Sequence, residues 1–408
     1  MGLKNSRDAC GGHDESIHTP LLALSAVLWY NTLMPTPSWN SFDGTNLLHA
    51  LEQWCTAEGV SDIHTSPEKK SVRIEVRLHG MLERIADIPH EIYIDFVRRV
   101  KFLSKLKLNL TNIPQDGQYT FEAPDDPQSS EQRRVVNVRV ATIPSRFGET
   151  FTLRLLDPMR GIVPLTKLGF PQEIHEKLGE LVKVPNGLIL VTGPTGSGKT
   201  TTLYSLLNSV VGTQRNIITL EDPIEYELSG IVQSQIDADH DYTFSSGLRS
   251  ILRHDPNIIL LGEIRDLETA QTAIDASLTG HLVLATLHTN SAIEAIPRLL
   301  SMGVSPYTFA PALRAILAQR LVRTLKDECR AQGAQCDPSS NATYNGRMCL
   351  PELILASTAL QNLILSGENA DVLLAQAKKE GYKTMRDWGE ILIKEKMTTR
   401  SEVDRVTA

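Results

Sequence analysis

The chain of 408 residues is too long for one compact core at about 100 to 200 residues per domain, so two or three domains are expected. A composition of 41% hydrophobic and 22% charged residues is typical of a soluble protein, and a net charge of -7 argues against nucleic acid as the main partner, which usually requires a basic surface. Five scattered cysteines predict no disulfide framework and favour a reducing cytoplasm.

Residues 1–40 form a short N-terminal tail that contains one apolar stretch, residues 20–35. This stretch is too short to span a bilayer, and it lacks the small-residue cleavage pattern of a signal peptide. We interpret it as a buried or partner-facing helix, with a membrane-surface helix as the alternative.

Residues 41–157 show the pattern of a small α+β domain. Apolar residues at helical spacing mark amphipathic helices, and apolar residues that alternate with polar ones mark half-buried strands. The predicted elements are helices at 46–59 and 92–108, strands at 71–80 and 81–87, and a pair of strands within 133–156.

Residues 158–172 are rich in proline and glycine and are predicted to form a linker or hinge. In residues 173–408, short apolar runs alternate with helical stretches, which indicates a parallel sheet covered on both faces. From about residue 301 the pattern predicts a C-terminal helical region, interrupted at 329–349 by a polar insert that contains cysteines. The predicted strands are 187–192, 216–220, 257–262 and 281–287, and the predicted helices between them include 244–254 and 267–280.

The stretch VTGPTGSGKTTTLYSLL, residues 191–207, matches the pattern G-x-x-x-x-G-K-[ST] between a predicted strand and a predicted helix. The glycines let backbone N–H groups curl around a β-phosphate, and the helix N-terminus adds its positive dipole end. Lys199 is expected to reach the β- and γ-phosphates, and the Thr200 hydroxyl to ligate Mg²⁺. The alternative is a glycine-rich turn without a ligand. The predicted nucleotide-binding residues are Gly193, Pro194, Thr195, Gly196, Ser197, Gly198, Lys199, Thr200 and Thr201.

Two groups of acidic residues follow apolar runs. Glu263 comes after the run at 258–261 and is the candidate for activating water, because Gly262 stands where an aspartate usually ends this strand. Glu221, Asp222 and Glu225 follow another run, and three carboxylates at a strand end would suit Mg²⁺ and its waters. Solvated acidic turns are the alternative.

His281 and His288 bracket a further apolar run in the stretch TGHLVLATLHTNSA. A lone histidine is usually structural. Two histidines that flank a buried strand of a phosphate-binding sheet are more typical of groups that sense the γ-phosphate.

Four stretches, GPTGSGKTTTLY, TLEDPIEY, ILRHDPNIILLGEIRD and TGHLVLATLHTNSA, resemble in order and separation the four nucleotide-site boxes of the secretion ATPases that drive type II secretion and type IV pilus assembly. The stretches SDIH, IPQDG and RVATIP of the smaller domain, and LAQRLVRTL and NGRMCLPELI beyond the sheet, also resemble this family. The resemblance covers about residues 45 to 400.

The resemblance implies an α/β fold, in which a RecA-like P-loop NTPase domain with a mainly parallel sheet follows a small PAS-like α+β domain. It implies ATP and Mg²⁺ as cofactors and a cytoplasmic homo-hexamer that docks on an inner-membrane platform protein. By the same resemblance Glu263 is the catalytic glutamate, Glu221 and Glu225 belong to the acidic box, and His281 and His288 to the histidine box.

Several positions depart from the family pattern. The insert has Cys329, Cys336 and Cys349 but no C-x-x-C pair, so no zinc is expected. The presence of an insert favours an assembly or secretion motor over a pilus-retraction motor. By the same resemblance, the family's first domain, which grips the membrane partner, is expected to be missing or reduced to residues 1–40.

Asn112 and Gln118 flank the PQDG loop, where the family commonly has arginines that reach a neighbour's nucleotide. Arg139 is preserved and is the expected arginine finger, with Arg154 or Arg77 as alternatives. The other interpretation of Arg139 is a solvated residue on the outer face of a strand. Two other functions stay open: a DNA-translocating motor, which the net charge disfavours, and a scaffold that binds nucleotide without hydrolysing it.

Overall fold

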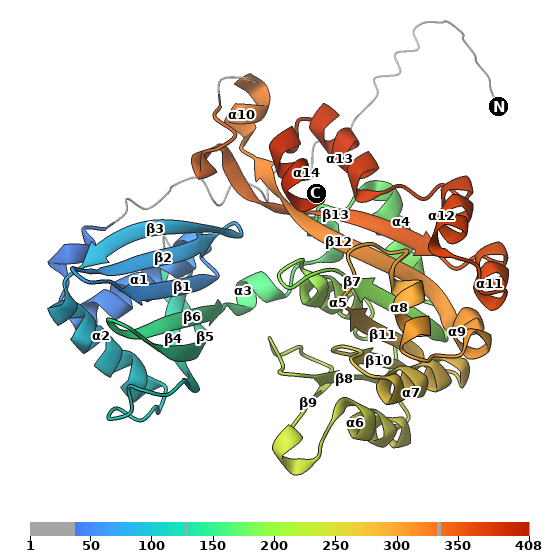
Figure 1. The fold of residues 1–408 in the computed structure, drawn as a ribbon, viewed down its shortest axis with the longest axis horizontal. Helices are drawn as coiled ribbons and strands as arrows, with labels where there is room; N and C mark the ends of the chain where they lie inside the picture. The colour runs from blue at the N-terminus through green and yellow to red at the C-terminus, as the bar shows by residue number, and fades with distance from the viewer. Residues whose placement is uncertain (1–36, 127–128, 333–335, 408) are drawn as a thin grey trace, which may run out of the picture. The chain divides into compact units, whose positions relative to one another are not determined.

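The strands of the first domain build a six-stranded antiparallel sheet in the order β3-β2-β1-β6-β5-β4 (Figure 1). Buried side chains of two helices, among them Leu47, Leu51 and Phe96, share one core with those of the strands. The α+β prediction is thereby confirmed, although β1 and β4 were not predicted as strands. The elements are η1 (Trp39–Ser41), α1 (Gly44–Glu58), β1 (Asp62–Pro67), β2 (Val72–Leu78), β3 (Met81–Ile88), α2 (His90–Leu103), β4 (Gln115–Asp126), β5 (Ser129–Ser145) and β6 (Gly148–Leu156).

This is a computed structural model, and it describes residues 37–126, 129–332 and 336–407. Residues 38–408 form one compact unit. The apolar stretch 20–35 lies outside the described residues, so its interpretation as a helix stays a prediction. Among the described helices, none combines the length and the apolar character needed to cross a bilayer.

A second sheet of seven strands follows, in the order β13-β12-β7-β11-β10-β8-β9. All neighbours pair in parallel except β13, which runs antiparallel to β12. Every residue of the four central strands β7, β11, β10 and β8 is buried, as expected for a parallel sheet covered on both faces. The mainly parallel α/β sheet is therefore confirmed.

From residue 158 onward, the strands of this sheet are connected mostly by helices, and these elements follow in chain order. They are α3 (Pro158–Gly161), η2 (Leu165–Lys167), α4 (Gln172–Leu181), β7 (Gly187–Thr192), α5 (Lys199–Asn208), β8 (Ile217–Glu221), β9 (Val232–Gln235), η3 (Ala238–His240), α6 (Phe244–Ile251), η4 (Leu252–His254), β10 (Ile258–Leu261), α7 (Leu267–Leu278), β11 (Leu282–Leu287), α8 (Ala295–Ser301), α9 (Pro306–Ala312), β12 (Leu313–Leu325), α10 (Asp327–Gln332), η6 (Asn341–Thr343), β13 (Tyr344–Leu355), α11 (Thr358–Leu365), α12 (Ala370–Lys379), α13 (Met385–Lys394) and α14 (Arg400–Thr407).

The prediction of a helical region from residue 301 onward is wrong for β12 and β13. The β12 sequence LRAILAQRLVRTL consists mainly of leucine, arginine and alanine, which favour helices in isolation. Its backbone instead pairs with β7 on one side and β13 on the other. Pairing on both sides outweighs the weak local preference for a helix.

The segment predicted as a polar insert, residues 329–349, differs from the prediction in its secondary structure and in the state of its cysteines. Its described part contains α10, and its last residues belong to β13, where Cys349 is a buried free thiol. Cys329 and Cys336 form a disulfide. The expectation of reduced thiols, which rested on few and scattered cysteines, is therefore wrong for this pair.

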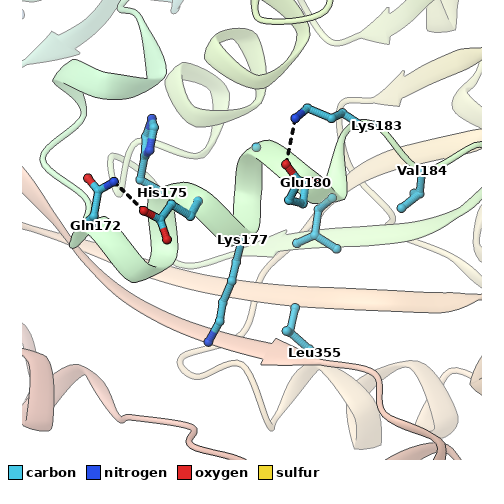
Figure 2. A pocket seen from close by; sticks show the side chains of 10 residues that line it. Gln172, His175, Lys177, Glu180, Lys183, Val184 and Leu355 are labelled. Atoms are coloured by element: carbon cyan, nitrogen blue, oxygen red, sulfur yellow. Dashed lines mark hydrogen bonds and ion pairs between the residues drawn. The ribbon is translucent and has the colours of Figure 1, made fainter.

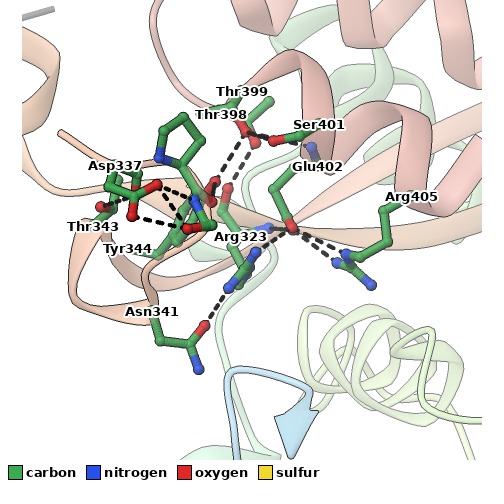
Figure 3. A network of polar contacts seen from close by, with 12 residues as sticks. Arg323, Asp337, Asn341, Thr343, Tyr344, Thr398, Thr399, Ser401, Glu402 and Arg405 are labelled. Carbon is green, nitrogen blue, oxygen red and sulfur yellow. Dashed lines mark hydrogen bonds and ion pairs between the residues drawn. The ribbon is translucent and has the colours of Figure 1, made fainter. Parts of the chain in front are cut away.

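A buried ionic cluster joins the C-terminal helix α14 to β12 (Figure 3). The Glu402 side chain is 1% exposed, and its carboxylate accepts hydrogen bonds from Arg323 Nη2 at 2.6 Å and Arg405 Nη2 at 2.7 Å. The Arg323 guanidinium also lies 4.0 Å from the ring centre of Tyr344. These contacts stabilise the packing of the last helix on the sheet.

Candidate functional site

The glycine-rich loop at 193–198 connects β7 to α5, as the sequence predicts. Gly193 and Gly198 have φ angles of 146° and 88°, a backbone region that favours glycine. A Cβ atom on Gly193 would also lie 2.6 Å from the main-chain oxygen of Gln319. The glycines are therefore required both by the backbone conformation and by the close approach of β12. The loop ends at the N-terminus of α5, a typical place for a phosphate.

Lys199 is the first residue of α5, and its side chain turns back over the loop. Its Nζ donates hydrogen bonds to the main-chain oxygens of Gly193 at 2.9 Å and Pro194 at 3.1 Å. Burial lowers the pKa of the Lys199 ammonium, and nearby Glu263 opposes this effect. The ammonium group therefore lies within the loop that is predicted to hold phosphate.

Glu263 lies just beyond the carboxyl end of β10, and its side chain is 18% exposed. One carboxylate oxygen pairs with Arg265, and the other lies 3.6 Å from Nε2 of His288. Thus three elements of the predicted site, the lysine, the glutamate and the second histidine, lie at the same edge of the sheet. A Cβ at Gly262 would lie 3.1 Å from the main-chain oxygen of Leu220, which leaves little room for an aspartate there.

Arg265 was not predicted to take part in the site. It pairs with Glu263 and also lies 3.5 Å from Asp222. Hydrogen bonding to Glu263 raises the pKa of the Arg265 guanidinium. The only sequence signal for this role was the presence of an arginine two residues after the glutamate, in GEIRD.

The three carboxylates of the acidic turn have different surroundings. Glu221 is 4% exposed and accepts hydrogen bonds from the Tyr204 and Thr219 hydroxyls and from Gln233 Nε2 at 3.1 Å. Its carboxylate therefore connects α5, β8 and β9 inside the protein. Glu225 is half-buried and faces Arg139 instead.

Arg139 lies on β5, and its Nη2 donates a hydrogen bond to the main-chain oxygen of Ile224 at 3.0 Å. Its other terminal nitrogen lies 3.7 Å from a Glu225 carboxylate oxygen. The structure thus brings Arg139 to the acidic turn that follows β8. Arg154 and Arg77, the alternatives, both lie against Asp62, at 2.8 Å and 3.5 Å.

The two histidines do not lie together. His288 follows the carboxyl end of β11, where burial, followed by the charge of Lys199, lowers the pKa of its imidazole. His281 precedes the amino end of β11, and its Nδ1 lies 2.9 Å from the main-chain oxygen of Ala276 at the end of α7. The seven residue steps from His281 to His288 along β11 separate the histidines by about 23 Å at roughly 3.3 Å per residue. The structure does not bring His281 to the predicted phosphate site.

The residues near Lys199 fit a magnesium ion that is bound mainly through phosphate. Mg²⁺ prefers oxygen ligands, keeps several waters, and commonly takes only one or two groups from the protein. Thr200 offers a hydroxyl next to Lys199, and the carboxylates of Glu263 and Asp222 lie at neighbouring strand ends. Within the described residues, no group of three or more histidine, cysteine or acidic side chains is arranged to hold a metal by itself.

Two cavities differ in their relation to these residues. A pocket of about 750 Å³ lies between the loop residues 193–195 and the segment 288–301, which includes His288 and Asn290. A pocket of about 720 Å³ lies along α4 beside Leu355 of β13 (Figure 2). The second pocket is mainly apolar and contains none of the predicted site residues, so we assign the site to the first.

A glutamine of β12 also contacts the loop and was missed by the sequence analysis. Gln319 Nε2 donates a hydrogen bond to the main-chain oxygen of Ser197 at 2.7 Å. The next residue, Arg320, donates to Asn290 Oδ1 at 3.1 Å in the segment after β11. The stretch LAQRLVRTL was noted for its resemblance, but a strand was not expected there, so these contacts could not be predicted.

Comparisons with known proteins agree with this geometry. The family model described as "Type II/IV secretion system protein" matches residues 45–405. The type II secretion system protein HxcR of Pseudomonas aeruginosa is 40% identical over 367 residues, which cover 88% of this chain and 76% of that protein. The type II secretion system ATPase E of Vibrio cholerae is 39% identical over 384 residues, covering 88% of this chain and 75% of that protein.

Solved structures show the same fold. The pilus retraction motor PilT with bound ADP has a TM-score of 0.60 at 28% identity, covering 89% of this chain and 96% of that one. The ATPase DotB of Legionella pneumophila has a TM-score of 0.69 at 22% identity, covering 93% of this chain and 99% of that one. The second likeness concerns the fold alone.

Proposed function

Because the chain belongs to the type II/IV secretion system protein family, we propose that it is a motor ATPase that hydrolyses ATP to power type II protein secretion or type IV pilus assembly. The observation that best supports hydrolysis is the meeting of Lys199, Glu263 and His288 at one edge of the sheet. Relatives named as type II secretion proteins make secretion the first candidate and pilus assembly the second.

In the proposed reaction, the backbone N–H groups of residues 196–200 bind the β-phosphate at the N-terminus of α5. Lys199 exchanges its two main-chain acceptors for phosphate oxygens, and Thr200 offers a hydroxyl to Mg²⁺. When bound, Mg²⁺ neutralises charge that develops on the phosphate oxygens. Water attacks the γ-phosphorus while the bond from that phosphorus to the bridging oxygen breaks, so that ADP leaves with the bridging oxygen, and Glu263 accepts a proton from the attacking water.

His288 and Arg265 have supporting roles in this proposal. Both contact the Glu263 carboxylate and thereby fix its direction. Glu221 is already occupied by three donors from the protein, so we propose that it holds the acidic turn in place and does not ligate Mg²⁺ directly. Glu225 holds Arg139, and His281 has no proposed catalytic role.

We also propose that the protein works as a homo-hexamer in the cytoplasm, docked on a platform protein of the inner membrane. The support for this is the family resemblance and the site itself, which presents its open side to solvent. In such a ring Arg139 can be offered to a nucleotide as a finger, after it leaves Glu225. Sedimentation analysis with and without ATP tests the hexamer.

Two substitutions test the proposed hydrolysis. Lys199→Ala should abolish nucleotide binding, whereas Glu263→Gln should keep nucleotide bound and lower kcat by at least about 100-fold, because it spares the phosphate loop. Lys183→Ala and Glu176→Gln, on the exposed surface near α4, are matched controls that should leave both quantities unchanged.

The outcomes separate the competing functions. Hydrolysis at the parent rate by Glu263→Gln would reject this glutamate as the base. Nucleotide binding without turnover in the parent protein would indicate a scaffold. Stimulation of hydrolysis by DNA would favour a nucleic-acid motor, which the net charge of -7 disfavours.

A further inference from the structure

Gln319 occupies a special place beside the phosphate-binding loop. In the pairing of β12 with β7, Ala318 lies opposite Thr192, so Gln319 comes level with Gly193, the first residue of the loop. The Gln319 side chain is 1% exposed, and its Nε2 donates a 2.7 Å hydrogen bond to the Ser197 oxygen. β12 therefore contacts the loop through a buried side-chain amide.

The local packing is not explained by stability alone. Gln319 Oε1 and Ser197 Oγ are both buried, and neither has a hydrogen-bond partner in the part of the chain that the structure describes. A buried polar atom without a partner destabilises the folded state. An apolar side chain of the same length would fill this space without leaving Oε1 unpaired. A glutamine here therefore serves something other than core packing.

The hydrogen bond from Gln319 orients the peptide group between Ser197 and Gly198. The Ser197 oxygen and the Gly198 N–H belong to one planar trans peptide, so they point in opposite directions. A hydrogen bond that fixes the oxygen toward β12 therefore directs the Gly198 N–H away from β12. Gly198 has a φ angle of 88°, in a backbone region that glycine adopts without steric cost, so without an anchor the peptide could rotate on its Gly198 side.

We propose that Gln319 is a positioning residue for nucleotide binding, which aims the Gly198 N–H at the phosphate of ATP or ADP. This inference rests on the proposed function, in which the loop at 193–198 binds nucleotide phosphate. Gln319 does not touch the nucleotide itself. It acts on binding through the orientation of one backbone donor, so its effect should fall on affinity and not on the chemical step.

The test replaces Gln319 by methionine, which has a similar length but cannot donate a hydrogen bond. An oriented hydrogen bond to a charged group contributes about 1.5 to 3 kcal/mol, which corresponds to roughly 10- to 100-fold in affinity. Gln319→Met should therefore raise the Kd for ADP and the KM for ATP at least about 10-fold. The value of kcat at saturating ATP should stay within about threefold of the parent.

Thermal unfolding separates this role from a general loss of stability. Without nucleotide, Gln319→Met should melt within about 2 °C of the parent, because removal of the unpaired Oε1 offsets the hydrogen bond lost at the Ser197 oxygen. The rise in Tm caused by a fixed ADP concentration should shrink, because that rise depends on affinity. Gln361→Met is the matched control. Gln361 Nε2 donates a hydrogen bond to the Leu313 oxygen at 3.4 Å, and Gln361 is distant in sequence from the loop. It should bind ADP like the parent.

Other outcomes overturn the inference. If the parent and Gln361→Met bind ADP, and Gln319→Met binds with a Kd within twofold of them, Gln319 does not position the loop. A loss of kcat with unchanged KM would place it in turnover instead. If the methionine variant does not fold, Gln319→Asn keeps the amide but withdraws it by one methylene, and parent-like ADP affinity in that variant counts equally against the proposal. Failure of the parent to bind ADP would reject the proposed function itself.

Discussion

Replacing Glu402 by glutamine should strongly destabilise the C-terminal part of the protein. Burial opposes ionisation of Glu402, but hydrogen bonds from Arg405 and Arg323 outweigh it and lower the pKa of the carboxyl from 4.5 to about 2. This difference corresponds to about 3 kcal/mol at about 1.4 kcal/mol per pKa unit. Because the Arg405 side chain is 39% exposed, solvent screening reduces the value to about 2 kcal/mol.

The total cost of the substitution also depends on the charge of Arg323, which would be left buried without its carboxylate; this total includes the interaction already counted in the pKa. The Arg323 side chain is 7% exposed, and breaking a buried ion pair at one partner costs about 3 to 5 kcal/mol. At about 2 to 4 °C per kcal/mol for a domain of this size, Glu402→Gln should lower Tm by at least about 6 °C. The control is Glu390→Gln, since the Glu390 and Arg400 side chains of this ion pair are 40% and 54% exposed. It should shift Tm by less than about 2 °C.

Thermal unfolding followed by circular dichroism at pH 7 measures both variants. The depressed pKa of Glu402 means that its contribution is present above pH 4.5 and is lost as the pH falls toward about 2. The difference between parent and Glu402→Gln should therefore narrow over this range. Equal melting of Glu402→Gln and Glu390→Gln at pH 7 would refute the assignment of the buried cluster as a major source of stability.

Arg139→Ala should lower ATP turnover at least about tenfold with little change in ATP affinity, whereas parent-like turnover would exclude Arg139 as the finger. Glu52 is buried against the Tyr119 hydroxyl, and burial raises the pKa of its carboxyl to about 7. The stability that its protonated form provides is complete below pH 4.5 and is lost as the pH rises through 7. Glu52→Gln should therefore gain about 3 kcal/mol of stability relative to the parent at pH 8 but not at pH 4. A stability difference that does not change with pH would contradict this. Peptide mapping without reductant should recover Cys329 linked to Cys336, and metal analysis should find no stoichiometric zinc, so one zinc per chain would disprove the latter prediction.

The parts of the fold that the sequence predicts correctly are those with strong local signals. The central strands are short, wholly apolar runs between turns, and such runs have few alternatives inside an α/β domain. β12 and β4 were missed for opposite reasons. β12 is composed of good helix formers, while β4 contains a glycine and a proline, which disfavour strands. In both cases the partner strand, which lies far away in the sequence or follows a turn, determines the structure.

The same division applies to the candidate site. The loop at 193–198 could be placed because glycines, lysine and the flanking elements occur together in one short stretch. The side chains that contact the loop and Glu263 could not be predicted. Gln319 reaches the loop because of the strand register, and Arg265 reaches Glu263 because of its side-chain rotamer. His281 and His288 are close in sequence, but they lie at opposite ends of one extended strand. Closeness in sequence therefore did not place both of them at the same site.

The hydrogen bonds from Lys199 to the Gly193 and Pro194 oxygens must be broken before the Lys199 ammonium can bind an anion. An incoming anion must replace these two main-chain acceptors of the Lys199 ammonium. The acceptors belong to the protein, so their hydrogen bonds cost no translational entropy, whereas binding of a free anion does. A chloride ion, with a single charge and no fixed directions, compensates poorly for that loss. A polyphosphate chain engages several backbone donors at once and compensates for it better. The two internal hydrogen bonds of Lys199 therefore favour a ligand with several anionic oxygens over a single small anion.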